Sequence, residues 1–138
     1  MSEVHIEPWR PEPDGSAPLQ RELEMLRDVL RAVVYGIVGT VTLDLGTPPN
    51  QRHRAEVAKL LVHPVARRRG IARALMIALE AVARAEGRTL LTLDTWTGRE
   101  AESLYRSLGY VVAGVIPRYA RGSLTPELEG TTIMYKDL

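Results

Sequence analysis

Val57 to Leu75 reads V-A-K-L-L-V-H-P-V-A-R-R-R-G-I-A-R-A-L, which is an apolar strand, a basic turn that contains a glycine, and the start of a helix. The first N–H groups of a helix have no partner within it, and the helix dipole adds partial positive charge at the same end. A turn that leads from a strand into a helix is therefore suited to bind phosphate oxygens. This segment predicts a protein that holds a phosphorylated cofactor.

The size and composition of the chain limit its class. A length of 138 residues suits one domain with a sizeable core, so residues 1–138 are expected to form a single domain. A formal net charge of +1 favours neither nucleic acid nor an anionic membrane surface as a partner. The chain has no cysteine and no long apolar run, and its three histidines are isolated. We therefore expect a cytoplasmic protein with no disulfide, no membrane span and no metal site.

Apolar periodicity predicts the elements around the opening segment. Leucines and a valine from Leu19 to Val33 are spaced by four, three, four and three residues, which predicts a helix. Two β-branched runs within 33–45 predict a cramped hairpin. A strand over 55–62, a helix from Gly70 to a cap at Gly87, and a strand over 89–94 then predict a right-handed βαβ unit with parallel strands.

The last third of the chain predicts one more helix and two more strands. Thr97 to Glu100 reads T-G-R-E, a capping box, and the helix that it opens is expected to stop at Gly109. Strands are expected over 110–116 and 131–136, separated by a long loop over 117–130 that is a candidate substrate contact.

Three ordered landmarks carry a resemblance to a known family. The segment R67-R-R-G-I-A72 fits the pattern Q/R-x-x-G-x-G/A, follows L60-L-V62 and precedes L104-Y-R-S-L-G-Y110. Together they resemble the acetyl-CoA-binding core of the GNAT superfamily of N-acetyltransferases, from about Gly39 to the C-terminus, and most closely the tabtoxin-resistance-type acetyltransferases. The resemblance implies an α/β fold in which helices flank a mixed central sheet.

The resemblance also implies acetyl-CoA as cosubstrate. The backbone of Leu60, Leu61 and Val62 would contact the pantetheine arm where strands 55–62 and 89–94 diverge at their carboxyl ends. The diphosphate would lie on the turn formed by Arg67, Arg68, Arg69, Gly70, Ile71, Ala72 and Arg73. The alternative interpretation of the three arginines is a solvated face, or a patch for generic anions or nucleic acid.

Acetyl transfer to an amine needs a proton acceptor, because an alkylammonium of pKa about 10 is charged at neutral pH. By resemblance, Glu56 and Asp94 are the candidate bases, with water between carboxylate and amine, and Tyr105 would protonate the departing CoA thiolate. Each of these three residues also has a purely structural interpretation. Glu56 would pair with Arg54 or Lys59, Asp94 would cap the next turn, and Tyr105 would be a core aromatic.

Two further groups of residues bear on the acceptor. Trp96, in the expected loop just beyond Asp94, would line an acceptor pocket or cover the sheet edge. Arg118, Tyr119 and Arg121 lie in the expected long loop, where a carboxylate-bearing acceptor would suit the two arginines.

The N-terminal region departs from the family pattern. GNAT domains usually place two helices between their first two strands, whereas only residues 19 to about 32 are available here, so one N-terminal helix is expected to be missing. The expected function is direct acetyl transfer to a primary amine of a small molecule, an amino-acid-like compound or an antibiotic. The alternative is a noncatalytic CoA-binding or regulatory homodimer with a degenerate acceptor site. A homodimer is expected in either case, because the missing helix would leave an apolar patch.

Overall fold

The computed structural model describes residues 36–122 and 125–138. The predicted helix from Leu19 to Val33, the first strand of the predicted hairpin and the expected loss of an N-terminal helix all concern residues outside these ranges.

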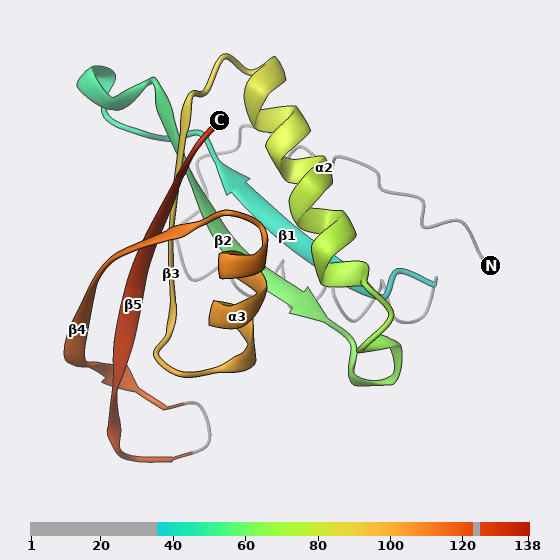
Figure 1. Ribbon diagram of the computed structural model, residues 1–138, viewed down its shortest axis with the longest axis vertical. Coiled ribbons are helices and arrows are strands. Elements are labelled where there is room, and N and C mark those ends of the chain that lie inside the picture. Colours follow the sequence, from blue (N-terminus) through green and yellow to red (C-terminus); the bar gives the residue numbers. More distant parts are fainter. Residues whose placement is uncertain (1–35, 123–124) are drawn as a thin grey trace, which may run out of the picture. The chain divides into compact units, whose positions relative to one another are not determined.

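The described strands form one mixed sheet in the order β1-β2-β3-β5-β4, and two α-helices accompany it (Figure 1). The strands are β1 (Gly39–Asp44), β2 (Arg54–Val62), β3 (Leu90–Trp96), β4 (Val111–Arg121) and β5 (Leu128–Asp137). The helices are α2 (Ile71–Ala85) and α3 (Glu100–Ser107), with short 3-10 turns at Pro49–Gln51 and Pro64–Ala66. The α/β class predicted from the sequence is confirmed. None of the helices in the described ranges is long and apolar enough to cross a membrane.

The described residues divide into two compact units, whose boundaries pass through β1, β2 and α2. The first unit contains residues 36–41 and 60–78. Its core forms where Ile71 and Leu75, four residues apart on one side of α2, pack with Ala66. A Cβ on Gly39 would lie 3.0 Å from Leu75 Cδ1 and 3.1 Å from Ile71 Cγ2, so glycine allows β1 to approach the helix closely.

The second unit contains the described residues of 42–59 and 79–138. In it, β3 pairs antiparallel with β5 from Leu90↔Asp137 to Trp96↔Thr131, and β5 pairs antiparallel with β4. One face of this sheet is buried and the other is partly open, as the alternation of burial along β3 indicates. The buried hydrophobic residues of the unit are Ala55, Val57, Leu79, Ala83, Leu91, Leu93, Tyr105, Tyr110 and Met134.

The parallel pair of β2 and β3 is short. It runs only from Arg54↔Leu90 to Glu56↔Thr92, although both strands continue further. Residues 57–59 of β2 have no partner on β3 among the described residues, and Lys59 has the left-handed φ of 55°. The two strands therefore pair in parallel, as predicted, over three residues near their amino ends.

Glycines end both helices as the sequence predicted. At the end of α2, Gly87 has φ 71°, its N–H donates to Arg84 O at 3.0 Å, and the N–H of Arg88 donates to Ala83 O at 2.9 Å. The same pair of bonds recurs after α3, where Gly109 has φ 89°. Both ends are Schellman motifs, which need a residue that adopts positive φ without strain.

The capping box predicted at the start of α3 is wrong. The helix begins at Glu100 after an N-cap, Arg99, whose side chain makes no capping hydrogen bond. Instead, Gly98 N–H donates to Glu102 Oε2 at 3.0 Å, and the Thr97 hydroxyl bonds Thr132 Oγ1 on β5 at 3.0 Å. The Thr97 hydroxyl therefore contacts β5 and is not the N-cap that the sequence spacing predicted.

The long loop predicted over 117–130 is also wrong, because most of it continues the two strands. Ala120↔Glu129 and Arg121↔Leu128 are paired, and the ladder is irregular between Ile116 and Ala120. Arg118 has φ 54° within this irregular stretch, next to Pro117. Proline and the irregularity fit because β4 lies at one edge of the sheet that the described strands form, where proline is tolerated.

Candidate active site

The basic turn of the first unit has the geometry of an anion site. Helix α2 begins at Ile71, and its first i→i+4 bond runs from Ala74 N–H to Gly70 O at 3.0 Å. The N–H groups of Ile71 and Ala72 lie in the first turn, before this bond, where the amides of a helix point out of its N-terminal end. Gly70 has φ 76°, and a Cβ built there would meet open space. The backbone at this point is accessible to a ligand.

The arginines of the turn supply positive charge around these amides. Arg67, Arg68 and Arg69 are all exposed. Arg67 Nε donates to the carbonyl oxygen of Val62, the last residue of β2, at 3.4 Å, and this contact holds the turn against the end of that strand. Helix N-terminus, accessible glycine and cations together fit a diphosphate. The structure brings together Leu60 to Val62 and Arg67 to Arg73, the predicted cofactor residues, within the first unit.

The two candidate bases share one face of the sheet in the second unit. Glu56 is in register with Thr92, and Asp94 follows Thr92 by two residues on β3, so the three side chains project to the same side. Both carboxylates are exposed, whereas Leu91 and Leu93 on the opposite face are 0% and 3% exposed. This face is called the open face below.

Asp94 has a buried partner that the sequence did not reveal. Thr131, only 2% exposed, places its Oγ1 3.0 Å from Asp94 Oδ2 and 3.1 Å from Thr95 O. Asp94 thus accepts a hydrogen bond from β5 rather than from the following turn. Arg54, one of the two partners expected for Glu56, donates instead to Gln51 Oε1 and to Thr92 Oγ1.

Tyr105 lies on α3 and is 6% exposed. Its ring meets that of Tyr110 edge-on, with centroids 5.7 Å apart. Burial, and then the negative charge of Asp94, raise the pKa of Tyr105 above its ordinary value of 10.0. The phenol therefore stays protonated at neutral pH, which a proton donor requires. Tyr105 is a core aromatic by packing and also lies within the electrostatic reach of Asp94.

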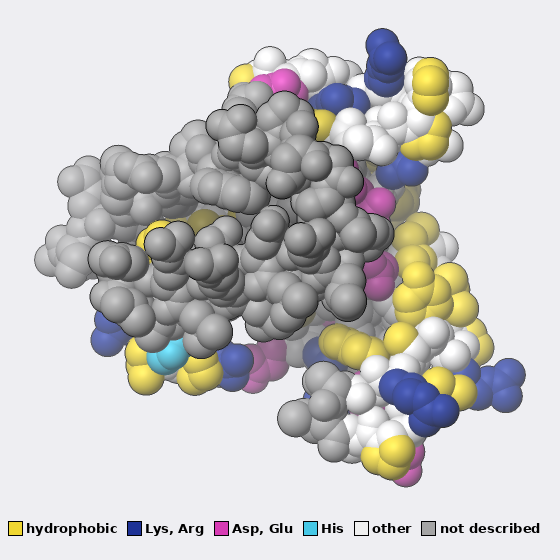
Figure 2. Space-filling model, turned by 180° about the vertical axis from the view of Figure 1, so that it is seen from behind, with side chains coloured by type: hydrophobic (Ala, Val, Ile, Leu, Met, Phe, Trp, Pro, Cys, Tyr) yellow, Lys and Arg dark blue, Asp and Glu magenta, His cyan; other side chains and the backbone are white. Residues whose placement is uncertain are grey.

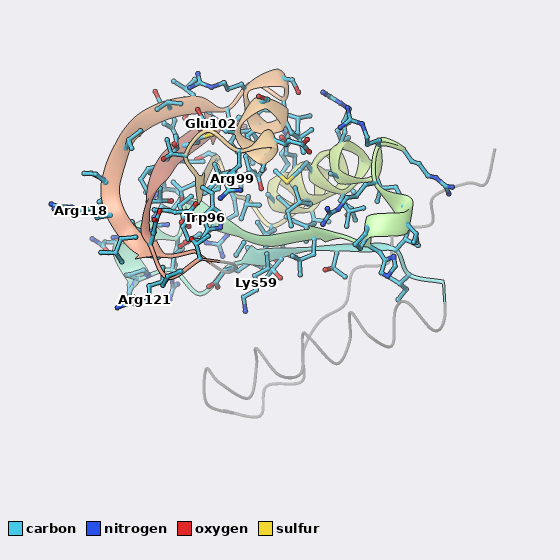
Figure 3. All side chains as sticks on the ribbon, turned by 90° about the horizontal axis from the view of Figure 1, so that it is seen from below. Lys59, Trp96, Arg99, Glu102, Arg118 and Arg121 are labelled. Carbon is cyan, nitrogen blue, oxygen red and sulfur yellow. The ribbon has the colours of Figure 1, made fainter. Side chains whose placement is uncertain are left out.

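The remaining predicted acceptor residues are placed differently. Trp96 is the last residue of β3 and pairs with Thr131, so the loop position expected for it is wrong. Arg118 points away from the sheet in Figure 3. Arg121, on β4, donates from Nη1 to Pro126 O at 3.0 Å, within its own hairpin. The two hairpin arginines therefore do not face the carboxylates of the open face.

A polar network around the start of α3 was not predicted. Glu102 accepts from Gly98 N–H and from Arg106, and Thr132 Oγ1 lies 3.2 Å from its Oε2. These contacts, the Gly98 amide first, hold the pKa of Glu102 below its ordinary value. Arg99 forms a two-pronged ion pair with Glu129 of β5, at 2.9 and 3.2 Å, beside Trp96 in Figure 3. The network fixes α3, and with it Tyr105, against β5.

Comparison with known proteins defines the class. Residues 2–110 match the model of the acetyltransferase (GNAT) family, so the chain belongs to this family. A ribosomal-protein-alanine N-acetyltransferase from Brucella melitensis is similar in structure, with a TM-score of 0.67 and 23% identity over 88% of this chain and 80% of that one. A GCN5-related N-acetyltransferase from Kribbella flavida has a TM-score of 0.65 and 26% identity, and the match covers 73% of this chain and 60% of that one.

A third similar structure was solved with a bound ligand. The yncA protein of Salmonella typhimurium, solved with its cofactor acetyl-CoA, gives a TM-score of 0.67 and 20% identity over 83% of this chain and 72% of that one. The GNAT family predicted from three short landmarks is thus confirmed, and the family uses acetyl-CoA.

Proposed function

We propose that this chain transfers the acetyl group of acetyl-CoA to a primary amine of a small molecule, an amino-acid-like compound or an antibiotic. The observation that carries the proposal is the open face of the second unit. Asp94 is exposed on this face and accepts a hydrogen bond from a buried hydroxyl, and its negative charge contributes to the raised pKa of Tyr105 on α3. Amine acetylation requires a proton acceptor and a proton donor, which these two residues supply.

Binding of the cosubstrate is assigned to the first unit. The N–H groups at the start of α2, those of Ile71 and Ala72, and the positive charge of Arg67 to Arg69 hold the diphosphate, and Gly70 leaves room for its oxygens. The backbone of Leu60 to Val62 holds the pantetheine arm. The support for this assignment is the exposed, positively charged helix start together with membership of an acetyl-CoA-using family.

The reaction needs three proton transfers. Glu56 or Asp94, directly or through water, takes one proton from the ammonium, and the neutral nitrogen then attacks the thioester carbonyl carbon. The C–N bond forms and the C–S bond breaks, Tyr105 gives its proton to the departing thiolate sulfur, and the acetylated nitrogen loses its second proton to solvent. The products are an N-acetyl compound and CoA, and solvent returns Tyr105 and the carboxylate to their starting states. Because the chain has no cysteine, no acetyl-cysteine intermediate is involved.

One experiment separates this proposal from a noncatalytic CoA-binding protein. The chain is incubated with acetyl-CoA and a panel of primary amines that includes glycinamide and phenylalaninamide, while thiol release and the melting temperature are followed. We expect acetyl-CoA to raise the melting temperature and the amines to release CoA thiol; binding at 100 times Kd adds about 2.7 kcal/mol. Stabilisation without amine-dependent thiol contradicts the enzyme proposal. No stabilisation at all contradicts the assignment of the turn.

A further inference from the structure

The register of β3, β5 and β4 places the side chains of the open face in rows. Asp94 pairs with Ile133, and Ile133 pairs with Gly114. This row, which we call the Asp94 strip, runs from a carboxylate across an apolar side chain to a residue with no side chain. A Cβ on Gly114 would have nothing within 4 Å, so the end of the strip is open space.

Larger side chains flank the strip on both sides. Tyr135 and Val111 are paired in one neighbouring row, and they are 36% and 51% exposed. In the other, Trp96 pairs with Thr131 and Thr131 with Ile116, which is 44% exposed. Figure 2, which views the molecule from behind, shows hydrophobic side chains gathered over the edge of the sheet that β4 forms. On β4, Gly114 thus lies between the larger side chains of Val111 and Ile116, so this end of the strip is lower than its neighbours.

We propose that the Asp94 strip is the acceptor subsite, and that the acceptor is a primary amine with a branched alkyl or aromatic group. This inference rests on the proposed function. The ammonium lies at Asp94, where the opposite charge is, and the apolar group lies over Ile133 and Gly114. Two strand spacings separate Asp94 from Gly114, so the apolar group lies within roughly 10 Å of the reacting nitrogen.

The charges of the open face agree with this acceptor. Asp94 and Glu56 attract a cation and disfavour an acceptor carboxylate close to the amine. The cations of the neighbouring strand are on β2, not on the strip: Arg54 is held by Gln51 and Thr92, and Lys59 lies beyond the last β2–β3 pair. The carboxylate-bearing acceptor expected from Arg118 and Arg121 loses its basis, because neither arginine belongs to the strip.

The test compares kcat/KM for phenylalaninamide with kcat/KM for glycinamide. We expect wild type to favour phenylalaninamide by about tenfold or more, because burial of an aromatic group on the strip adds binding energy. Gly114→Val, which fills the open end with a residue suited to strands, should reduce this ratio about tenfold. Gly114 has no positive φ, so the substitution introduces no backbone strain.

Two further variants complete the design. Val115→Leu adds bulk to the same strand on the opposite face, where Val115 pairs with Thr132, and should leave the ratio unchanged. Ile116→Thr keeps a β-branched residue but lowers the apolar wall, and should reduce the ratio even if Gly114→Val fails to fold. Each variant is checked by its melting temperature.

The outcomes separate this inference from the proposed function. If wild type acetylates neither amide nor any other amine, the proposed function fails. If wild type acetylates both amides equally, or if neither Gly114→Val nor Ile116→Thr changes the ratio, only the strip inference fails. Sedimentation tests a second copy as the occupant. A dimer that Val111→Asp dissociates without changing the ratio makes this surface a self-interface and overturns the inference.

Discussion

At the scale of single residues, Tyr105 has two roles that one substitution separates. Tyr105→Phe keeps the ring that packs against Tyr110 and removes the proton that the mechanism gives to the thiolate. We expect kcat to fall about 100-fold, since general acids contribute at least this much, while acetyl-CoA still raises the melting temperature. The measurement is steady-state thiol release together with thermal shift. Unchanged kcat would reduce Tyr105 to a packing residue.

Thr131 is the residue that adapts to the charge of Asp94. Its hydroxyl has one proton and two acceptors in range, Asp94 Oδ2 at 3.0 Å and Thr95 O at 3.1 Å. When Asp94 is ionised, Thr131 donates to it. When Asp94 has taken a proton, the carboxyl group donates to Thr131, whose own proton turns to Thr95 O. Both protonation states therefore keep their hydrogen bonds.

Thr131→Val should lower kcat about tenfold, and Thr131→Ser should restore most of it, because serine keeps the hydroxyl and valine keeps the shape. The loss corresponds to a hydrogen bond to a charged group, worth about 1.5 kcal/mol. In an Asp94→Asn background the same valine substitution should cost much less, which a double-mutant cycle measures. Equal costs in the two backgrounds would show that Thr131 acts only through packing.

At the scale of elements, a buried ion pair joins the C-terminal half of α2 to β5. Lys136 Nζ lies 2.9 and 2.8 Å from the carboxylate oxygens of Glu80 and donates to Leu108 O at 2.7 Å. Glu80 is 6% exposed. The same lysine thus ties two helices to the strand that carries Thr131.

Lys136→Met should lower the free energy of unfolding by about 3 kcal/mol, because the buried carboxylate loses its close partner and keeps the longer ion pair to Arg84, whose Nη2 lies 3.8 Å from Glu80 Oε2. Adding Glu80→Gln should recover part of the loss, since the poorly paired buried charge is then gone. Urea unfolding of the three variants measures both steps. If Lys136→Met alone is as stable as wild type, Glu80 finds water or another donor in place of the lysine.

Elements set by neighbouring residues were predictable, and those set by distant pairing were not. The apolar stripe and Gly87 fix both ends of α2 within a few residues of sequence, and Gly109 does the same for α3. Pro117 suggested a loop because proline interrupts strands, yet the pairing of residues 120–121 with 128–129 extends β4 and β5 past it. A proline signal is local, whereas strand pairing is decided across the hairpin.

The candidate site also has one part that neighbouring residues made predictable and another that depends on distant strand pairing. The basic turn over residues 67–73 is one continuous segment, so its glycine, its arginines and its helix start were all visible in the sequence. The contact between Asp94 and Thr131 joins residues 37 apart, and it depends on the register of β3 with β5. The Asp94 strip depends both on the register of β3 with β5 and on that of β5 with β4, and no pattern along the chain marks Gly114 as part of it.

At the scale of the whole molecule, two buried tyrosines make stability depend on alkaline pH. Burial raises the pKa of Tyr105, and burial together with the charge of Glu80 raises that of Tyr110 further. In the unfolded chain both phenols ionise near pH 10. Below that pH both states keep their protons and the full stability remains. Above it the unfolded state releases protons that the folded state retains, so the free energy of unfolding falls as pH rises.

Melting temperatures between pH 8 and pH 11 test this dependence. We expect a steady fall above about pH 10 in wild type and a shallower fall in Tyr110→Phe, which keeps the ring and removes the group with the larger shift. The difference between the two proteins, not the fall itself, carries the argument. Tyr105→Phe serves as the matched variant with a smaller expected effect. Parallel curves for wild type and Tyr110→Phe would show that the Tyr110 phenol ionises in the folded protein as it does in the unfolded chain.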